Sequence, residues 1–169
     1  MYKPDMRPLE SSFTVCAWVK KQHDIHAPTW FSYSTREQTF EIDIADSGYH
    51  TRIFGDAFDL RSVYTVPHGQ WFHNCLSWSA ASQTRNVYIN GVLVDAEGTP
   101  GGKTLGQDGY LVIGNEQDVY GGGMDSDHMF GGNSINSMYL VGCSPPRRYE
   151  RCLEVCAPLL RRDMELRDI

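Results

Sequence analysis

Short runs of alternating apolar and polar residues, separated by turn residues, most constrain the fold of this chain of 169 residues. Successive side chains of a strand point to opposite faces, so this period of two predicts strands with one buried face. We expect strands over the following ranges: Phe13–Val19, Trp30–Ser34, Thr39–Ile44, Tyr49–Phe54, Trp71–Ser79, Val87–Ile89, Val92–Asp95, Tyr110–Gly114 and Ser137–Val141. Asn90-Gly91, between two of these runs, is a strong signal for a hairpin. The pattern predicts an all-β, antiparallel two-sheet sandwich.

The length fits one domain, which we expect over residues 1–143, followed by a tail of residues 144–169 that begins with two prolines. The net charge of -6 argues against a nucleic-acid partner. No apolar run approaches the ~20 residues of a membrane helix. The first residues lack the apolar core of a signal peptide, which indicates either a cytosolic protein or a domain cut from a longer secreted chain.

None of the five cysteines forms a CxxC pair, which argues against a zinc knuckle. Cys16 and Cys75 lie in strand-like runs, where a disulfide between neighbouring strands is plausible. Cys143, Cys152 and Cys156 cannot all pair with one another. A bond within Cys152–Cys156 and a bond from Cys143 to either one remain alternatives.

An acidic, glycine-rich loop follows the run at 110–114. Its carboxylates are those of Glu116, Asp118, Asp125 and Asp127, and no Lys or Arg lies between Lys103 and Arg147. Such a loop repels itself unless a cation lies in it, and calcium prefers carboxylate and carbonyl oxygens in flexible loops. The alternative is a solvated acidic loop that binds nothing.

The run His73-Asn74-Cys75-Leu76-Ser77-Trp78 matches the core of the pentraxin signature, although Ala80 stands where that signature closes with Ser or Thr. Three further runs follow the family's order: Phe13-Thr14-Val15-Cys16, Phe31-Ser32-Tyr33-Ser34-Thr35 and Ile113-Gly114-Asn115-Glu116-Gln117-Asp118. From about Tyr2 to Gly142 the chain therefore resembles the pentraxins, the family of C-reactive protein and serum amyloid P component. Relative to that family it looks truncated at both ends.

The resemblance implies a jelly-roll sandwich, a disulfide joining Cys16 to Cys75, and paired calcium ions that present a ligand-binding face. It also implies secretion and ring-shaped oligomers, often pentamers. Such a domain would bind an anionic or phosphorylated surface ligand without being an enzyme. The alternative is an adhesion or scaffolding module of a larger extracellular protein whose calcium site has decayed.

The family's calcium ligands are only partly matched. Glu116, the Gln117 carbonyl and Asp118 match the central ligands. Asp125 stands where the family has Glu, and His128 stands where it has Gln. Upstream, the family's Asp-Asn pair is replaced by Thr39-Phe40. We therefore expect one weakly bound calcium ion rather than two.

A competing interpretation concerns the run Glu41-Ile42-Asp43-Ile44-Ala45-Asp46, which resembles the Glu-x-Asp-x-x-Glu motif of laminarinase-type glucanases. Retaining hydrolysis needs two carboxyl groups ~5–5.5 Å apart. Glu41 offers the first, but Asp46 is shorter than the Glu that the motif requires. We favour a strand whose outward positions are acidic, with Ile42 and Ile44 toward the core.

Overall fold

The computed structural model describes residues 11–21, 28–37, 42–45, 50–59, 68–99, 102–130 and 134–142, and within these ranges every regular element is a strand. The strands are β1 (Ser12–Lys20), β2 (Thr29–Ser34), β3 (Ile42–Ala45), β4 (His50–Ile53), β5 (Asp56–Asp59), β6 (Trp71–Ser79), β7 (Thr84–Ile89), β8 (Val92–Gly98), β9 (Tyr110–Ile113) and β10 (Ser134–Gly142). No helix in the described part is long and apolar enough to cross a membrane.

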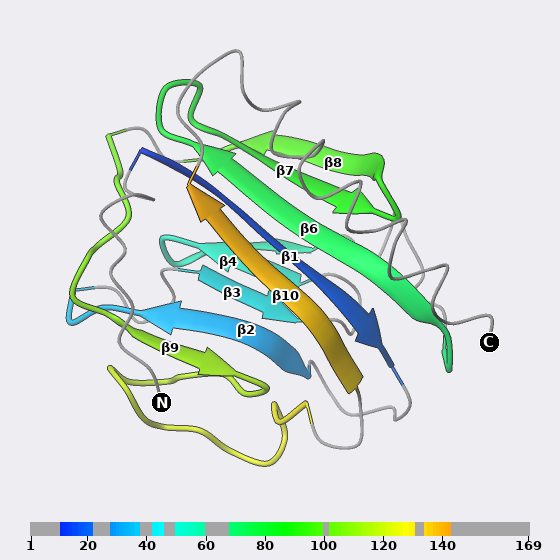
Figure 1. The fold of residues 1–169 in the computed structure, drawn as a ribbon. Coiled ribbons are helices and arrows are strands. Elements are labelled where there is room, and N and C mark those ends of the chain that lie inside the picture. The colour runs from blue at the N-terminus through cyan, green and yellow to red at the C-terminus, as the bar shows by residue number, and fades with distance from the viewer. Residues whose placement is uncertain are drawn as a thin grey trace.

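The strands form two five-stranded sheets, in the orders β10-β1-β6-β7-β8 and β5-β4-β3-β2-β9. All neighbouring strands pair antiparallel. Figure 1 shows the first sheet in front of the second, so the molecule is a two-layer sandwich. The predicted all-β, antiparallel jelly-roll class is confirmed.

The core lies between the two sheets because alternate residues of both point inward. Trp30 from one sheet and Phe13 and Trp78 from the other are fully buried. Phe13 and Trp78 lie with their ring centroids 5.7 Å apart. Trp18 is also buried, whereas Trp71 is partly exposed. Of the four tryptophans, Trp30 and Trp78 belong to this core, whereas the buried Trp18 packs on His73, with ring centroids 5.4 Å apart.

Two hairpins differ in whether their turn residues could be recognised in the sequence. Asn90 and Gly91 have φ values of 49° and 80°, as a two-residue hairpin of this kind requires, and the predicted turn is confirmed. A second hairpin, between β4 and β5, turns at Phe54 (φ 54°) and Gly55 (φ 83°). The strand β5 was not expected, because a bulky residue such as Phe54 rarely adopts a positive φ.

Cys16 and Cys75 lie directly opposite each other in the register of β1 and β6 and form a disulfide. The bond that the family resemblance implied is therefore confirmed. His73 lies beside it on β6, is buried, and burial lowers the pKa of its imidazole from 6.5 to about 4. Cys143, Cys152 and Cys156 lie outside the described residues.

Candidate functional site

The acidic loop follows β9 and returns to its own starting point. The Phe130 amide donates to the Gly114 carbonyl at 2.8 Å, which closes the base of the loop. The Gly114 amide donates to the Trp30 carbonyl at 3.1 Å, and the Thr29 amide donates to the His128 carbonyl at 3.0 Å. Both ends of the loop are therefore tied to β2, and in Figure 1 the loop forms the lower edge of the molecule.

Gln117 anchors the loop from inside. Its side chain is fully buried, and its Nε2 donates to the main-chain carbonyls of Ser32 and Tyr110, each at 3.1 Å. The Ser34 hydroxyl donates to its Oε1 at 3.0 Å. The Gln117 side chain therefore joins the loop to β2 and β9. It was expected as a calcium ligand only through its main-chain carbonyl, and this role of the side chain was not foreseen.

The glycine run makes a sharp turn in the loop. Gly121 and Gly123 have φ values of 69° and 71°. A Cβ on Gly123 would lie 2.8 Å from the Cβ of Asp118. A Cβ on Gly121 would lie 2.7 Å from Cδ2 of Tyr110. Both positions therefore require glycine, and the turn folds back closely over Asp118.

Tyr120 fixes the outer part of the loop against the neighbouring loop at 102–109. Its hydroxyl donates to the Asp108 carbonyl at 2.8 Å. The Arg36 guanidinium lies over its ring, 4.5 Å from the centroid. This cation–π contact brings a positive charge beside the loop.

Asp125 holds the second half of the loop. Its Oδ1 accepts hydrogen bonds from the main-chain amides of Asp127 at 2.9 Å and His128 at 3.1 Å. Its main-chain carbonyl accepts one from Asn115 Nδ2 at 2.9 Å, which links the two halves of the loop. One oxygen of this predicted ligand is thus already engaged by the backbone.

Glu116 forms an ion pair with a residue that the sequence analysis missed. Arg52 Nη1 on β4 donates to Glu116 Oε1 at 2.8 Å, and the Glu116 side chain is only 7% exposed. The sheet register carries Arg52 toward the loop, since it pairs with Asp43 on β3, which pairs with Ser32 on β2. The guanidinium supplies a positive charge that the loop's own sequence lacks.

His128 lies between two of the predicted ligands. Its Nδ1 is 3.6 Å from Glu116 Oε2 and 3.3 Å from Asp125 Oδ1. The imidazole therefore lies between these two carboxylates, within ion-pair distance of both. A cation that used both carboxylates would have to share them with this ring.

The structure thus brings the predicted ligands Glu116, Gln117, Asp118, Asp125 and His128 into one closed loop. The oxygen donors among them suit calcium, whereas the His128 imidazole does not. Arg52 already donates to Glu116 Oε1, and two main-chain amides donate to Asp125 Oδ1. Among the described residues, the only His, Cys, Asp or Glu group with three donor atoms within 4.8 Å of one another is Cys16, His73 and Cys75. Thr39, Phe40, Glu41 and Asp46 lie outside the described residues.

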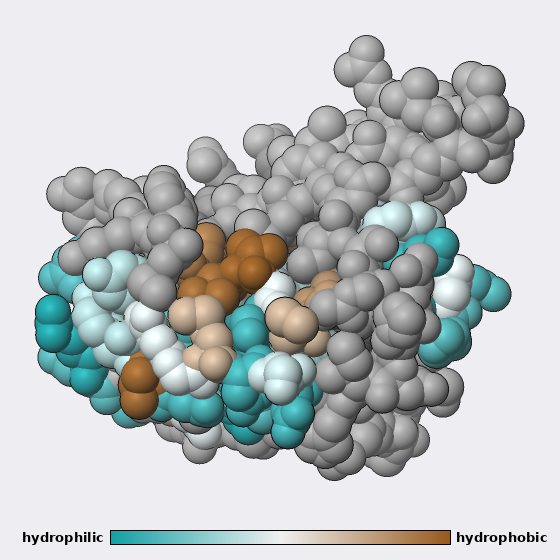
Figure 2. Space-filling model, turned by 90° about the horizontal axis from the view of Figure 1, so that it is seen from below, coloured by the Kyte–Doolittle hydropathy of each residue, from teal (hydrophilic) through white to brown (hydrophobic). Residues whose placement is uncertain are grey.

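Exposed apolar side chains accompany the acidic ones. Figure 2, viewed from the side of the loop, shows apolar surface set among hydrophilic surface. The exposed large apolar residues of β9 and the loop are Ile113, Val119, Met124 and Met129. The loop therefore offers a ligand both carboxylates and apolar surface.

The sequence and the sandwich fold have counterparts among known proteins. The family model described as the Pentaxin family matches residues 2–143. The chain belongs to the pentraxin family. Mucosal pentraxin from Bos taurus is 33% identical over 132 residues, which cover 76% of this chain and 59% of the relative. The chain thus spans less than two thirds of that pentraxin's length.

Two solved structures share the fold. The native heptameric SAP-like pentraxin from Limulus polyphemus matches with a TM-score of 0.67 and 22% identity, over 81% of this chain and 66% of that one. The full extracellular region of zebrafish Gpr126/Adgrg6 matches with a TM-score of 0.66 and 19% identity, over 81% of this chain and 19% of that one. This pentraxin fold therefore also matches part of a much larger extracellular region.

Proposed function

We propose that this chain is a secreted, non-enzymatic recognition domain that binds anionic or phosphorylated surface ligands through calcium. Glu116, the Gln117 carbonyl, Asp118 and Asp125 would hold the ion. Bound calcium would supply a positive charge that bridges protein oxygens and ligand oxygens. The observation that carries this proposal is the closed, hydrogen-bonded loop, which gathers these groups on one edge of the sandwich.

The loop's own contacts lead us to propose a weak site. Calcium takes about six to eight oxygen ligands, and here Glu116 Oε1 and Asp125 Oδ1 already accept hydrogen bonds. Binding calcium through Glu116 means competing with the Arg52 guanidinium. We therefore propose that occupancy requires calcium at the level of extracellular modules, ~10⁻⁴–10⁻³ M.

The ion pair between Arg52 and Glu116 also favours a second candidate function, an adhesion or scaffolding module that needs no calcium. In this reading the guanidinium at 2.8 Å takes over the neutralising role of the ion. The match to part of a larger extracellular region is compatible with such a module. In this second reading the exposed apolar residues of the loop would supply the contacts.

Binding to immobilised phosphocholine, with calcium and with a chelator, tests the first proposal. We expect binding with calcium and its loss with the chelator. Asp118→Asn should weaken this binding, whereas Asp127→Asn, which makes the same charge change in the same loop outside the proposed ligand set, should not. Calorimetry should show calcium uptake at millimolar concentrations. Absence of uptake together with ligand binding in the chelator would support the second candidate instead.

A further inference from the structure

A polar cleft opens where β2 ends and β9 begins. The two strands pair antiparallel with Ser34 opposite Tyr110, so the residues that follow β2 and those that precede β9 leave the sheet at the same point. In Figure 1 this point lies at the left end of the second sheet. The two segments border a cleft of about 220 Å³, which is lined by Thr35, Arg36, Glu37, Gly106, Gln107 and Asp108.

Hydrogen bonds hold the wall that precedes β9. Tyr33 is fully buried, its hydroxyl donates to the Gly106 carbonyl at 2.8 Å, and the same hydroxyl accepts from the Gly109 amide at 3.1 Å. On the outer side, the Tyr120 hydroxyl donates to the Asp108 carbonyl at 2.8 Å. The backbone of this wall is therefore fixed from the core and from the acidic loop.

Arg36 brings the positive charge of the lining. Its guanidinium lies over the Tyr120 ring, 4.5 Å from the centroid, and that ring packs edge-on against Tyr110 with centroids 4.8 Å apart. A guanidinium that contacts an aromatic ring through its face still presents its N–H groups along its edge. Arg36 is exposed, so the aromatic pair orients hydrogen-bond donors that a ligand can reach.

The residue types of the lining favour a neutral ligand over an ion. Glu37 and Asp108 contribute two carboxyl groups against the single guanidinium of Arg36, so a simple anion would meet more negative than positive charge. A simple cation would meet the guanidinium. A hydroxyl group suits both kinds of partner, because it donates to a carboxylate and accepts from a guanidinium or an amide. Several hydroxyl groups on one small molecule are the chemistry of a sugar.

The size of the cleft limits the ligand to one small unit. Its volume of about 220 Å³ lies below the ~300–1,000 Å³ of pockets that hold drug-sized molecules. We propose that this cleft binds one unit of a neutral saccharide, with Arg36 and Gln107 donating to its oxygens and with Glu37 and Asp108 accepting from its hydroxyl groups. None of these four residues belongs to the proposed calcium ligands, so the site works without calcium.

The experiment uses the full chain in a calcium chelator. The probes are the methyl glycosides of mannose, galactose and glucose, which carry no charge. Saturation-transfer NMR detects binding, and titration gives the Kd. We expect at least one glycoside to bind with a Kd of ~1 mM, as the affinity per atom of small ligands gives for so few atoms. Methyl phosphate is the charged comparison and should bind more weakly.

Two variants assign the binding to the cleft. Arg36→Met and Asp108→Ala each remove a charged hydrogen-bonding group, so each should weaken glycoside binding about tenfold or more. Lys103→Met and Asp127→Ala make matched charge changes at exposed positions outside the lining and should leave the Kd unchanged. The Tm of each variant shows that it is folded.

Four outcomes would overturn the proposal. These are no binding of any of the three glycosides, binding that requires calcium, tighter binding of methyl phosphate than of the glycosides, and unchanged binding in both cleft variants. Binding that requires calcium would assign the sugar to the acidic loop instead. Phosphocholine binding is measured separately, so its failure would remove the proposed calcium function and leave this site unaffected.

Discussion

Arg52 and Glu116 form an ion pair of 2.8 Å although they are 64 positions apart in the sequence. The pair connects β4 with the loop that follows β9. It gives an otherwise acidic loop a counter-charge from β4, which lies two strands from β2 in the same sheet. Under the proposed function, a calcium ion at Glu116 would compete with the Arg52 guanidinium, and a single substitution would alter this competition.

Replacing Arg52 by methionine removes the guanidinium but keeps an unbranched, apolar side chain. We expect calcium affinity to rise about tenfold, which corresponds to about 1.4 kcal/mol. Without calcium the variant should lose about 1–3 kcal/mol of unfolding free energy, because a hydrogen bond between charged groups is lost. Calorimetry and urea denaturation with and without calcium measure the two effects.

Arg36→Met is the matched control for that variant. Arg36 lies over Tyr120 of the same loop, so its loss removes an equal charge from the neighbourhood without touching Glu116. A tenfold gain in calcium affinity in both variants would mean that the total positive charge near the loop, rather than the ion pair with Glu116, sets the calcium affinity. An unchanged affinity in Arg52→Met would contradict the competition.

The second prediction concerns the effect of replacing the loop glycines by alanine on stability and on calcium binding. Gly123→Ala forces a left-handed residue and places its Cβ 2.8 Å from that of Asp118. We expect a cost of about 1–3 kcal/mol in unfolding free energy and weaker calcium binding, because Asp118 must move. Gly121→Ala should behave similarly, with Tyr110 displaced instead. Thermal unfolding and calcium titration measure both effects.

Gly122→Ala is the control within the same run. Gly122 does not have a positive φ. A Cβ at this position would lie 3.4 Å from Val119 Cγ2, close to an ordinary van der Waals contact. We expect a change within about 1 kcal/mol. Equal losses in all three variants would show that the glycines matter as a flexible group rather than through their individual backbone angles.

The contrast between the two hairpins shows how far the sequence could predict the fold. Asn90-Gly91 adopts the angles that its residue types favour, so the turn was predictable locally. Phe54 adopts a positive φ while its ring packs on Trp78, with centroids 5.0 Å apart, and such a long-range contact gives no local signal for β5. The sandwich itself followed from period-two alternation, since that pattern is what burying one face of a sheet demands.

The same distinction applies to the candidate site. The acidic composition and the family motif placed the predicted ligands in one loop, which the structure shows closed at its base. Arg52 could not be foreseen, because its proximity to Glu116 depends on the order β4-β3-β2 in the sheet. The anchoring role of the Gln117 side chain also depends on burial, which a polar residue in an acidic loop does not suggest.

Gln117 leads to a third prediction. Its buried amide makes hydrogen bonds to Ser32, Ser34 and Tyr110. Gln117→Ala removes these and leaves the partners without that amide, so we expect a loss of about 2–4 kcal/mol of unfolding free energy. Gln70→Ala, at an exposed position just before β6, should change it by less than about 0.5 kcal/mol. Similar losses in urea denaturation for the two variants would refute the anchoring role.

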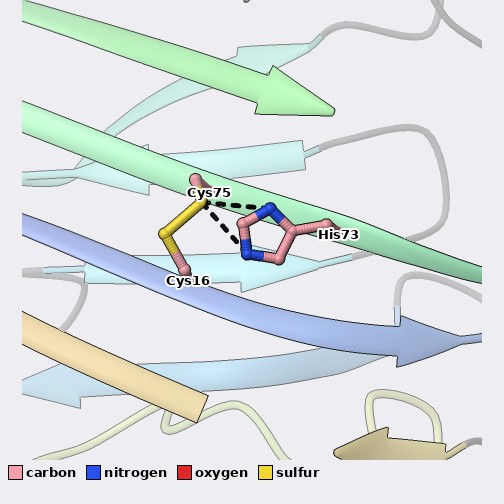
Figure 3. A group of neighbouring side chains, drawn as sticks. All are labelled: Cys16, His73 and Cys75. Atoms are coloured by element: carbon pink, nitrogen blue, oxygen red, sulfur yellow. Dashed lines mark hydrogen bonds between the residues drawn. A yellow bond between two sulfur atoms is a disulfide. The ribbon is translucent and has the colours of Figure 1, made fainter. Parts of the chain in front are cut away.

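The buried His73, which lies beside the disulfide (Figure 3), predicts how stability depends on pH while that disulfide is intact. Its pKa is lowered from 6.5 to about 4 by burial, so between these values the unfolded chain binds a proton that the folded chain does not. Stability is therefore fully present above pH 6.5 and falls as the pH decreases toward 4. The shift corresponds to a loss of about 3 kcal/mol at most. His73→Phe, which cannot titrate, should flatten the profile of unfolding free energy over this range, and a profile as steep as the parent's would assign the acid sensitivity to other groups.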